Sequence, residues 1–225
     1  MASRVSTRWL MLAGVVGPVT FVTVFLVEGA IRPGYDAARQ FVSLLSLGDG
    51  GWLQVANFIV TGLLIAGFGL GLRRRWAGIR RGRWAPRLLI LVGFALIGAG
   101  LFAPDPALGY PAGAPAGLPT SVSWHGGVHY LAALGVFLGL PITMAIATQH
   151  APSANARTWA VYSLASGAVM LLGWLATFTV TGPDGTLMVA GLLQRIAVVA
   201  GFQWLVATAV IELRRPASAP VLAFA

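Results

Sequence analysis

The sequence predicts an all-α integral membrane protein, a single domain over residues 1–225 with six transmembrane helices. Its composition excludes an ordinary soluble domain, because 57% of the 225 residues are hydrophobic and only 9% are charged, whereas soluble domains carry about 25% charged residues. The mean hydropathy of +0.82 agrees with this. The sequence contains no cysteine, which excludes disulfides, iron–sulfur clusters and thiolate metal sites.

Six apolar runs are long enough to cross a bilayer, which takes about 20 residues of helix. Tryptophan lies at the ends of the proposed spans, as an aromatic belt requires. Glycine pairs at helical spacing, such as Gly67/Gly71 and Gly135/Gly139, predict close helix packing. The expected spans are residues 9–31, 52–72, 84–103, 124–147, 158–181 and 187–211.

Arginine placement predicts the orientation of these helices. The fifteen basic residues are all arginine, and twelve of them lie before the first span, after the second or fourth, or after the sixth. Cytoplasmic loops carry the excess of basic residues, so both termini are expected to be cytoplasmic. This placement also explains the net charge of +9 and the arginine-rich segment 73–87, which we expect to contact anionic lipid headgroups. Nucleic acid is therefore not an expected partner.

The first outer loop has an amphipathic pattern. From Asp36 to Leu47 the polar residues, including Ser43 and Ser46, follow one helical stripe and the apolar residues follow another. The pattern predicts a short amphipathic helix in the outer membrane interface. The serines then either pack at that interface or face a ligand.

Two of the three histidines open the fourth span. His125 and His129 are four residues apart, which places both imidazoles on one face of a helix. With a carboxylate from Asp105, Asp36 or Glu28 they could form a two-histidine, one-carboxylate site for a divalent metal such as zinc. The alternative is that both histidines form hydrogen bonds with loop carbonyls and acids.

A charged residue lies inside the sixth span. An unpaired arginine there costs about 2.5–3.5 kcal/mol, so Arg195, which follows Gln194, is expected to be buried and paired with an acid. Glu28 is the first candidate partner, and Asp36 and Asp105 are the next candidates. The pair would be either a structural lock between helices or part of a functional site.

Several short segments of the chain form a recognisable set of motifs. They are 31–36 (Ile-Arg-Pro-Gly-Tyr-Asp), 43–48 (Ser-Leu-Leu-Ser-Leu-Gly), 51–54 (Gly-Trp-Leu-Gln), Asn57-Phe58, Asp105-Pro106, His125 with His129, and 193–195 (Leu-Gln-Arg). These motifs resemble a bacterial membrane-protein family, domain of unknown function 998. The resemblance implies a six-helix integral membrane protein but no established activity, so function must be argued from the residues.

These residues together predict an outward-facing polar pocket at the outer leaflet, covered by the Pro- and Gly-rich loop 106–120. It would bind or modify a lipid or isoprenoid-type ligand. As an enzyme, a metal-assisted hydrolase or lipid-modifying enzyme, it would use His125, His129, Asp105 and Glu28 as catalytic residues. The alternative is a non-catalytic lipid-binding, sensor or transporter-like protein with a structural charge cluster. Ligand contacts are expected from Arg195, Gln194, Asp36, Tyr35, Ser43 and Ser46.

Overall fold

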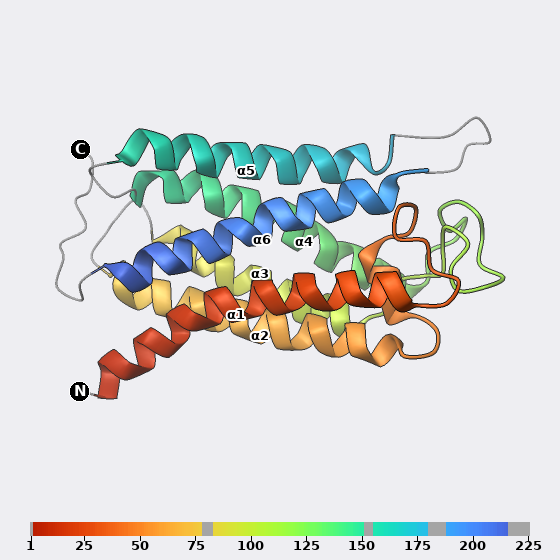
Figure 1. The fold of residues 1–225 in the computed structure, drawn as a ribbon, viewed down its shortest axis with the longest axis horizontal. Coiled ribbons are helices and arrows are strands. Elements are labelled where there is room, and N and C mark those ends of the chain that lie inside the picture. The colour runs from red at the N-terminus through yellow and green to blue at the C-terminus, as the bar shows by residue number, and fades with distance from the viewer. Residues whose placement is uncertain (1, 78–82, 151–154, 180–187, 216–225) are drawn as a thin grey trace.

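The computed structural model is an all-helical bundle and describes residues 2–77, 83–150, 155–179 and 188–215 (Figure 1). Six of its helices are long and apolar enough to span a membrane, which confirms the predicted fold class. These are α1 (Ala2–Ile31), α2 (Gly51–Arg75), α3 (Trp84–Leu101), α4 (Trp124–Ala147), α5 (Ala156–Ala176) and α6 (Ala190–Arg214), with short 3-10 helices η1 (Val42–Ser46) and η2 (Thr148–His150).

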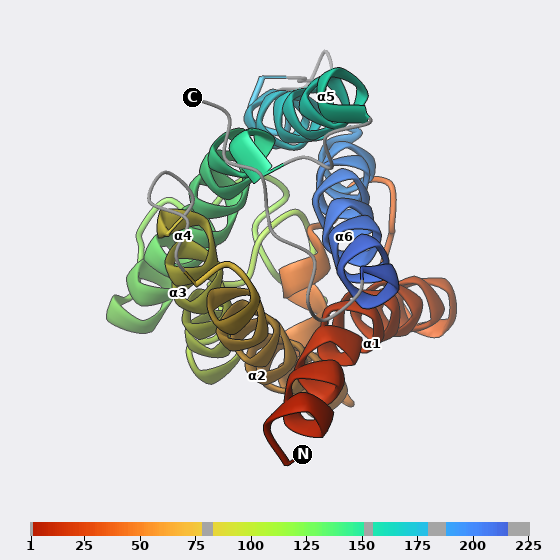
Figure 2. The ribbon, with the colours of Figure 1, turned by 90° about the vertical axis from the view of Figure 1, so that its left-hand side faces the viewer.

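The six long helices form a ring in chain order. Each helix packs against its neighbours in the sequence, and α6 closes the ring by packing against α1. Figure 2 shows this ring along its axis.

The predicted spans agree with the helices to within a few residues at most ends. The fourth, 124–147, coincides with α4. The first differs at its start, because α1 begins at Ala2 and not at residue 9. The fifth differs at its end, because α5 ends at Ala176 and residues 177–179 continue as tight turns with i to i−3 hydrogen bonds. The remainder of the fifth span and the start of the sixth fall on residues 180–187, outside the described residues.

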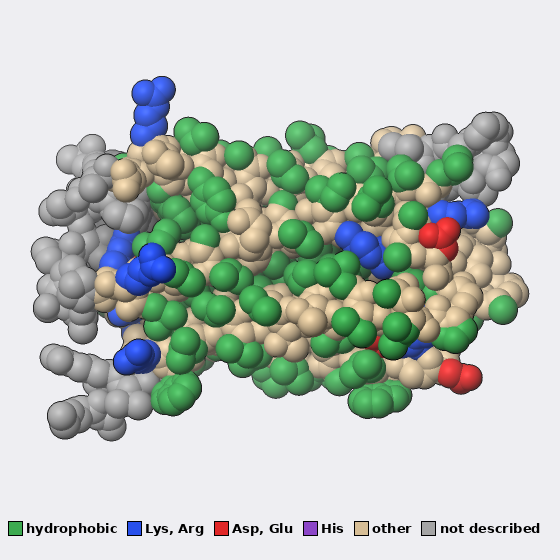
Figure 3. Space-filling model, viewed as in Figure 1, with side chains coloured by type: hydrophobic (Ala, Val, Ile, Leu, Met, Phe, Trp, Pro, Cys, Tyr) green, Lys and Arg blue, Asp and Glu red, His purple; other side chains and the backbone are tan. Residues whose placement is uncertain are grey.

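The two ends of the ring differ in charge. One end, called here the arginine-rich end, holds the C-terminus of α2, the start of α3, the start of α5 and the C-terminus of α6. On the face in Figure 3, arginines gather at this end, whereas the acidic side chains lie toward the opposite end, with further arginines near them. The arginines at this end whose side chains are described are Arg8, Arg73, Arg74, Arg75, Arg83, Arg87, Arg157, Arg214 and Arg215.

A buried carboxylate ties α2 to α6 at the arginine-rich end. Glu212 is 3% exposed and accepts hydrogen bonds from Arg75 Nε at 3.0 Å, Trp76 Nε1 at 3.3 Å and Arg215 Nη1 at 2.6 Å. The cluster places one acid between two cations at the end of a membrane-spanning core, so we assign it a structural role.

Helices α2 and α3 approach most closely at two glycines that the sequence did not single out. A Cβ on Gly62 would lie 2.5 Å from the carbonyl oxygen of Gly93, and one on Gly93 would lie 2.6 Å from that of Gly62. Of the pairs named from the sequence, Gly71 packs tightly against α1, but Gly67 has only an ordinary contact with Leu10. The spacing of small residues therefore predicted that helices pack closely, but it did not predict that α2 and α3 meet at Gly62 and Gly93.

The first loop differs from the predicted amphipathic α-helix over 36–47. The structure has a turn at Asp36–Gln40 followed by the 3-10 helix η1, whose Leu44 and Leu45 are fully buried in the ring. The reason is that the apolar residues of the loop find a protein core to pack against, which stabilises more than lying along an interface. The loop thus plugs the end of the ring opposite the arginine-rich end.

Candidate functional site

Asp105 and Ser123 cap the start of α4. The Asp105 carboxylate accepts hydrogen bonds from Ser123 N at 3.0 Å and Ser123 Oγ at 2.5 Å, and Ser123 Oγ accepts from Gly126 N at 3.1 Å. A negative side chain is favourable at a helix N-terminus, where the backbone N–H groups lack helical partners. A Cβ on Gly126 would lie 2.1 Å from Asp105 Oδ2, so glycine is required for this approach.

His125 belongs to the same cap. Its Nδ1 lies 3.1 Å from the carbonyl oxygen of Ala103 and 3.1 Å from Ser123 Oγ. A carbonyl only accepts hydrogen bonds, so Nδ1 carries the proton and donates it. The Asp105–Ser123–His125 cluster therefore joins the end of α3 to the start of α4, with its carboxylate bonded to serine and not to imidazole.

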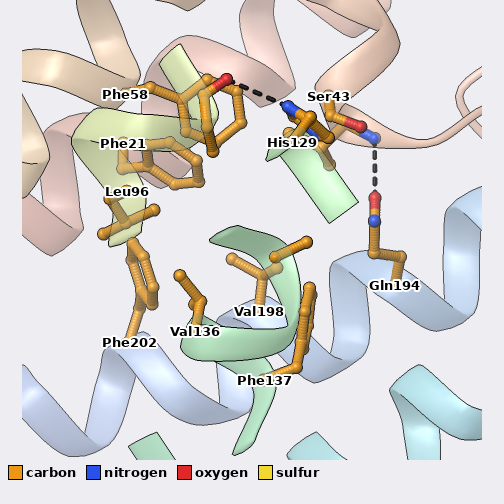
Figure 4. Close-up of a pocket in the computed structure, with 13 residues that line it drawn as sticks. Phe21, Ser43, Phe58, Leu96, His129, Val136, Phe137, Gln194, Val198 and Phe202 are labelled. Atoms are coloured by element: carbon orange, nitrogen blue, oxygen red, sulfur yellow. Dashed lines mark hydrogen bonds between the residues drawn. The ribbon is translucent and has the colours of Figure 1, made fainter. Parts of the chain in front are cut away.

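His129 lies one turn deeper and is 3% exposed. Its Nδ1 lies 3.0 Å from the carbonyl oxygen of Ala99 and 2.8 Å from that of Phe102, two C-terminal carbonyls of α3 that lack helical partners (Figure 4). Nδ1 is therefore the protonated nitrogen, and Nε2 holds the free lone pair of the neutral ring. Both histidines thus bond loop or helix-end carbonyls, as the alternative interpretation of the sequence expected.

His125, His129 and Asp105, the residues predicted as metal ligands, are bonded to other groups of the protein. No three histidine, cysteine or acidic side chains are placed to share a metal ion within the described residues. His125 and His129 each bond a different part of the end of α3 through Nδ1, and Asp105 is occupied by Ser123. Helical spacing put the two imidazoles on one side of α4, and there their Nδ1 atoms bond different carbonyls at the end of α3.

Arg195 is buried at 7% exposure, and all its hydrogen-bond partners among the described residues are neutral oxygens. Its Nη1 donates to the carbonyl oxygens of Ala37, Gln40 and Gly191 at 2.5 to 3.0 Å, and its Nη2 donates to Tyr35 Oη at 2.7 Å. It thereby pins the first loop onto α6. Burial raises the pKa of Tyr35 to about 12, although the nearby guanidinium of Arg195 acts to lower it, so Tyr35 stays neutral and accepts this hydrogen bond.

The predicted ion pair of Arg195 with an outer acid is wrong. Glu28 pairs with Arg32 at 2.5 Å, one turn later in the chain, and Asp36 accepts the backbone N–H of Ala38 at 2.9 Å in a turn. Arg32 also bonds the carbonyls of Asp49 and Gly50. An arginine has five N–H donors, so carbonyls and a hydroxyl satisfied Arg195 without a carboxylate.

A cavity of about 490 Å³ lies between α4, α5 and α6 at the end opposite the arginine-rich end. Residues of the loop after α3 and the first loop also line it. Leu131 is 69% exposed, and Leu134 and Phe178 are 40% and 45% exposed, so the cavity opens on the apolar outer surface of the ring. The lining residues are Phe41, Ser43, Leu44, Pro104, Asp105, Ala107, Leu118, Pro119, Val122, Gly127, His129, Tyr130, Leu131, Ala133, Leu134, Trp174, Phe178 and Gln194.

A smaller extension of about 50 Å³ continues into the centre of the ring. Four residues line both spaces: Ser43, His129, Ala133 and Gln194. Figure 4 shows the extension, with apolar side chains from α1, α2, α3, α4 and α6 around it and Gln194 bonded to the loop. The polar groups at this junction are His129, Gln194 and Ser43, and they face an otherwise apolar space.

The chain matches one protein family over most of its length. The model of the family described as protein of unknown function, DUF998, matches residues 15–211. The chain belongs to the DUF998 family. Comparison with curated proteins and with solved structures gave no match.

In this DUF998 chain the structure separates the predicted site residues into four groups. Two groups are structural, the Glu28–Arg32 pair and the Arg195–Tyr35 cluster. The third is the α4 cap, in which Asp105 also reaches the cavity wall. The fourth is the cavity group of His129, Gln194 and Ser43, whereas Ser46 Oγ donates to the carbonyl of Ser43 at 2.6 Å.

The aromatic wall of the cavity was missed by the sequence analysis. Trp174 lines the cavity and stacks on Phe137 with ring centroids 5.1 Å apart and an interplanar angle of 6°. Phe178 packs edge-on to Trp174. These residues lie in apolar spans where aromatic residues are ordinary, so no local signal distinguished them from lipid-facing ones.

Proposed function

We propose that this DUF998 protein binds a lipid-type amphiphile in the cavity between α4, α5 and α6. The observation that carries the proposal is the cavity's opening on the apolar surface through Leu131, Leu134 and Phe178. A ligand dissolved in the membrane reaches it laterally, without crossing water. The volume lies within the range of small-molecule sites, about 300–1,000 Å³. An apolar wall with a few polar groups is the usual composition of such sites.

We further propose that the cavity faces the outer leaflet. The support is the arginine excess at the opposite end of the ring, which the positive-inside rule assigns to the cytoplasm. With this orientation, the loop 102–123 covers the cavity on the outer side of the membrane.

The absence of native cysteine makes this orientation directly testable. Ala116→Cys places an exposed thiol in the 102–123 loop, and Thr158→Cys places one at the start of α5. We expect a membrane-impermeant maleimide to label Ala116→Cys on intact cells and Thr158→Cys only after permeabilisation. The reverse pattern would invert the topology, and labelling of both on intact cells would contradict six spans.

Filling the cavity tests ligand binding. Ala133 lines both the cavity and its extension, so Ala133→Trp should occupy the space that a ligand needs. We expect at least a tenfold loss of cavity-bound lipid, measured by mass spectrometry of lipid retained by the purified protein. Leu138→Trp is the matched control, because Leu138 is on the same helix, 38% exposed and outside the cavity lining. Equal lipid content in both variants would refute the proposal.

A further inference from the structure

We propose that the cavity selects an amphiphile whose head group is an uncharged hydroxyl, as in a long-chain primary alcohol, over one with a phosphate or carboxylate head. This inference rests on the proposed function and adds the chemical class of the ligand. It follows from the hydrogen-bonding capacity of three side chains at the junction of the cavity and its inner extension, namely His129, Gln194 and Ser43.

His129 offers an acceptor. Its Nδ1–H is held by the carbonyls of Ala99 and Phe102 at 3.0 and 2.8 Å, which fixes both the tautomer and the ring position. The neutral ring then presents the lone pair of Nε2. A ligand group that donates a hydrogen bond satisfies this atom, and a group that only accepts does not.

Gln194 offers a donor. Its Oε1 accepts the backbone N–H of Val42 at 2.7 Å, as the dashed line in Figure 4 marks. Only the oxygen of the amide accepts a hydrogen bond, so this contact fixes the orientation of the amide and leaves the Nε2 hydrogens for other partners. The first loop thereby positions a donor at the same junction where α4 positions an acceptor.

Ser43 completes the set with a group that can donate or accept. Its backbone carbonyl is bonded to Ser46, but no hydrogen bond to its Oγ is found among the described residues. A ligand hydroxyl can donate one hydrogen bond to His129 Nε2 and accept hydrogen bonds from Gln194 Nε2 and from Ser43 Oγ. Its hydrogen-bonding capacity therefore matches that of the three side chains. An ester carbonyl would leave His129 Nε2 without a donor.

The described part of the lining gives an anionic head no counter-charge. Among its described residues Asp105 is the one acidic or basic side chain, and a carboxylate repels an anion. Arg195 lies next to Gln194 in the chain, but its guanidinium is bonded to Ala37, Gln40, Gly191 and Tyr35 and is not in the lining. Placing an unpaired phosphate in an apolar space is strongly unfavourable, so the cavity discriminates against it.

The test uses the full-length protein in nanodiscs and three probes with the same chain: tetradecan-1-ol, tetradecyl phosphate and tetradecanoate. Affinities come from competition with tritiated tetradecan-1-ol. We expect the alcohol to bind at least tenfold more tightly than either anion. If the phosphate or the carboxylate binds as tightly as the alcohol, and Ala133→Trp blocks all three, the head-group inference is overturned while the proposed function stands. If Ala133→Trp has no effect on any probe, the proposed function itself fails.

Two variants test the named groups. Gln194→Glu keeps an oxygen for Val42 N but replaces the amide donor by an anionic acceptor, so alcohol binding should weaken by tenfold or more. Ser43→Ala removes a hydroxyl with no assigned protein partner, so it should weaken alcohol binding several-fold and leave thermal stability unchanged. Gln149→Glu makes the same amide-to-carboxylate change at the end of α4 remote from the cavity, and Thr148→Ala removes a hydroxyl there. Both should leave affinity unchanged. Wild-type affinity in both Gln194→Glu and Ser43→Ala would overturn the inference.

Discussion

Replacing Arg195 by leucine should destabilise the protein by about 2–5 kcal/mol, because it strands buried acceptors that the guanidinium now satisfies. The carbonyls of Ala37 and Gln40 and the hydroxyl of Tyr35 would each lose a charged donor, and a buried polar group left without a partner costs about 1–3 kcal/mol. We expect the loss as a lower unfolding midpoint in detergent, with the first loop detached from α6.

Two comparisons isolate this effect. Arg157→Leu removes an exposed arginine at the start of α5 and should change stability by less than about 0.5 kcal/mol. Adding Glu28→Leu to Arg195→Leu should give no recovery, because Glu28 pairs with Arg32. Recovery in the double variant would instead indicate an ion pair between Glu28 and Arg195.

The contact of α2 with α3 should be the second most sensitive point. Gly62→Ala places a methyl group 2.5 Å from the carbonyl oxygen of Gly93 and 2.7 Å from a side-chain carbon of Ile97. Backbone cannot move aside as a flexible side chain does, so the helices must separate, at a cost of about 1–3 kcal/mol for overpacking. Unfolding midpoints from size-exclusion thermal stability measurements would detect this loss.

Gly67→Ala is the matched control on the same helix. Its methyl group would meet only Leu10 Cδ2 at 3.5 Å, an ordinary contact, and alanine has a higher helix propensity than glycine. We expect unchanged or slightly higher stability. Equal losses in Gly62→Ala and Gly67→Ala would show that glycine flexibility, and not the close approach of α2 and α3, sets the effect.

The candidate site could be predicted in part. The sequence drew attention to His129, Gln194 and Ser43, because histidine, an amide beside a membrane-embedded arginine and serines in an amphipathic loop stand out in an apolar chain. It grouped them with His125, Asp105, Glu28 and Arg195 into one pocket. In the structure His125 belongs to the α4 cap, Glu28 pairs with Arg32 and Arg195 bonds the first loop, whereas Asp105 both caps α4 and lines the cavity. A polar residue near a helix end has many possible partners, and only packing selects among them.

Backbone carbonyls explain most of these differences. The sequence predicted partners among charged side chains, because a sequence identifies side chains but not which backbone groups lie free. In the structure the partners of Arg195, His125 and His129 include the unpaired carbonyls at loop turns and at the end of α3. Such acceptors exist at every helix end, and which of them a side chain reaches depends on the three-dimensional path of the chain.

The sequence by itself determined the class of protein and the number and approximate bounds of its helices, because the cost of burying polar groups in a bilayer leaves long apolar runs no other structure. Tertiary structure alone decided that the first loop plugs the ring, that Asp105 caps α4, and that α4, α5 and α6 enclose a cavity with an aromatic wall. These features depend on contacts between segments far apart in the chain. A contact between two distant segments leaves no regular pattern of residues in the sequence of either one. It is therefore known only from the assembled structure.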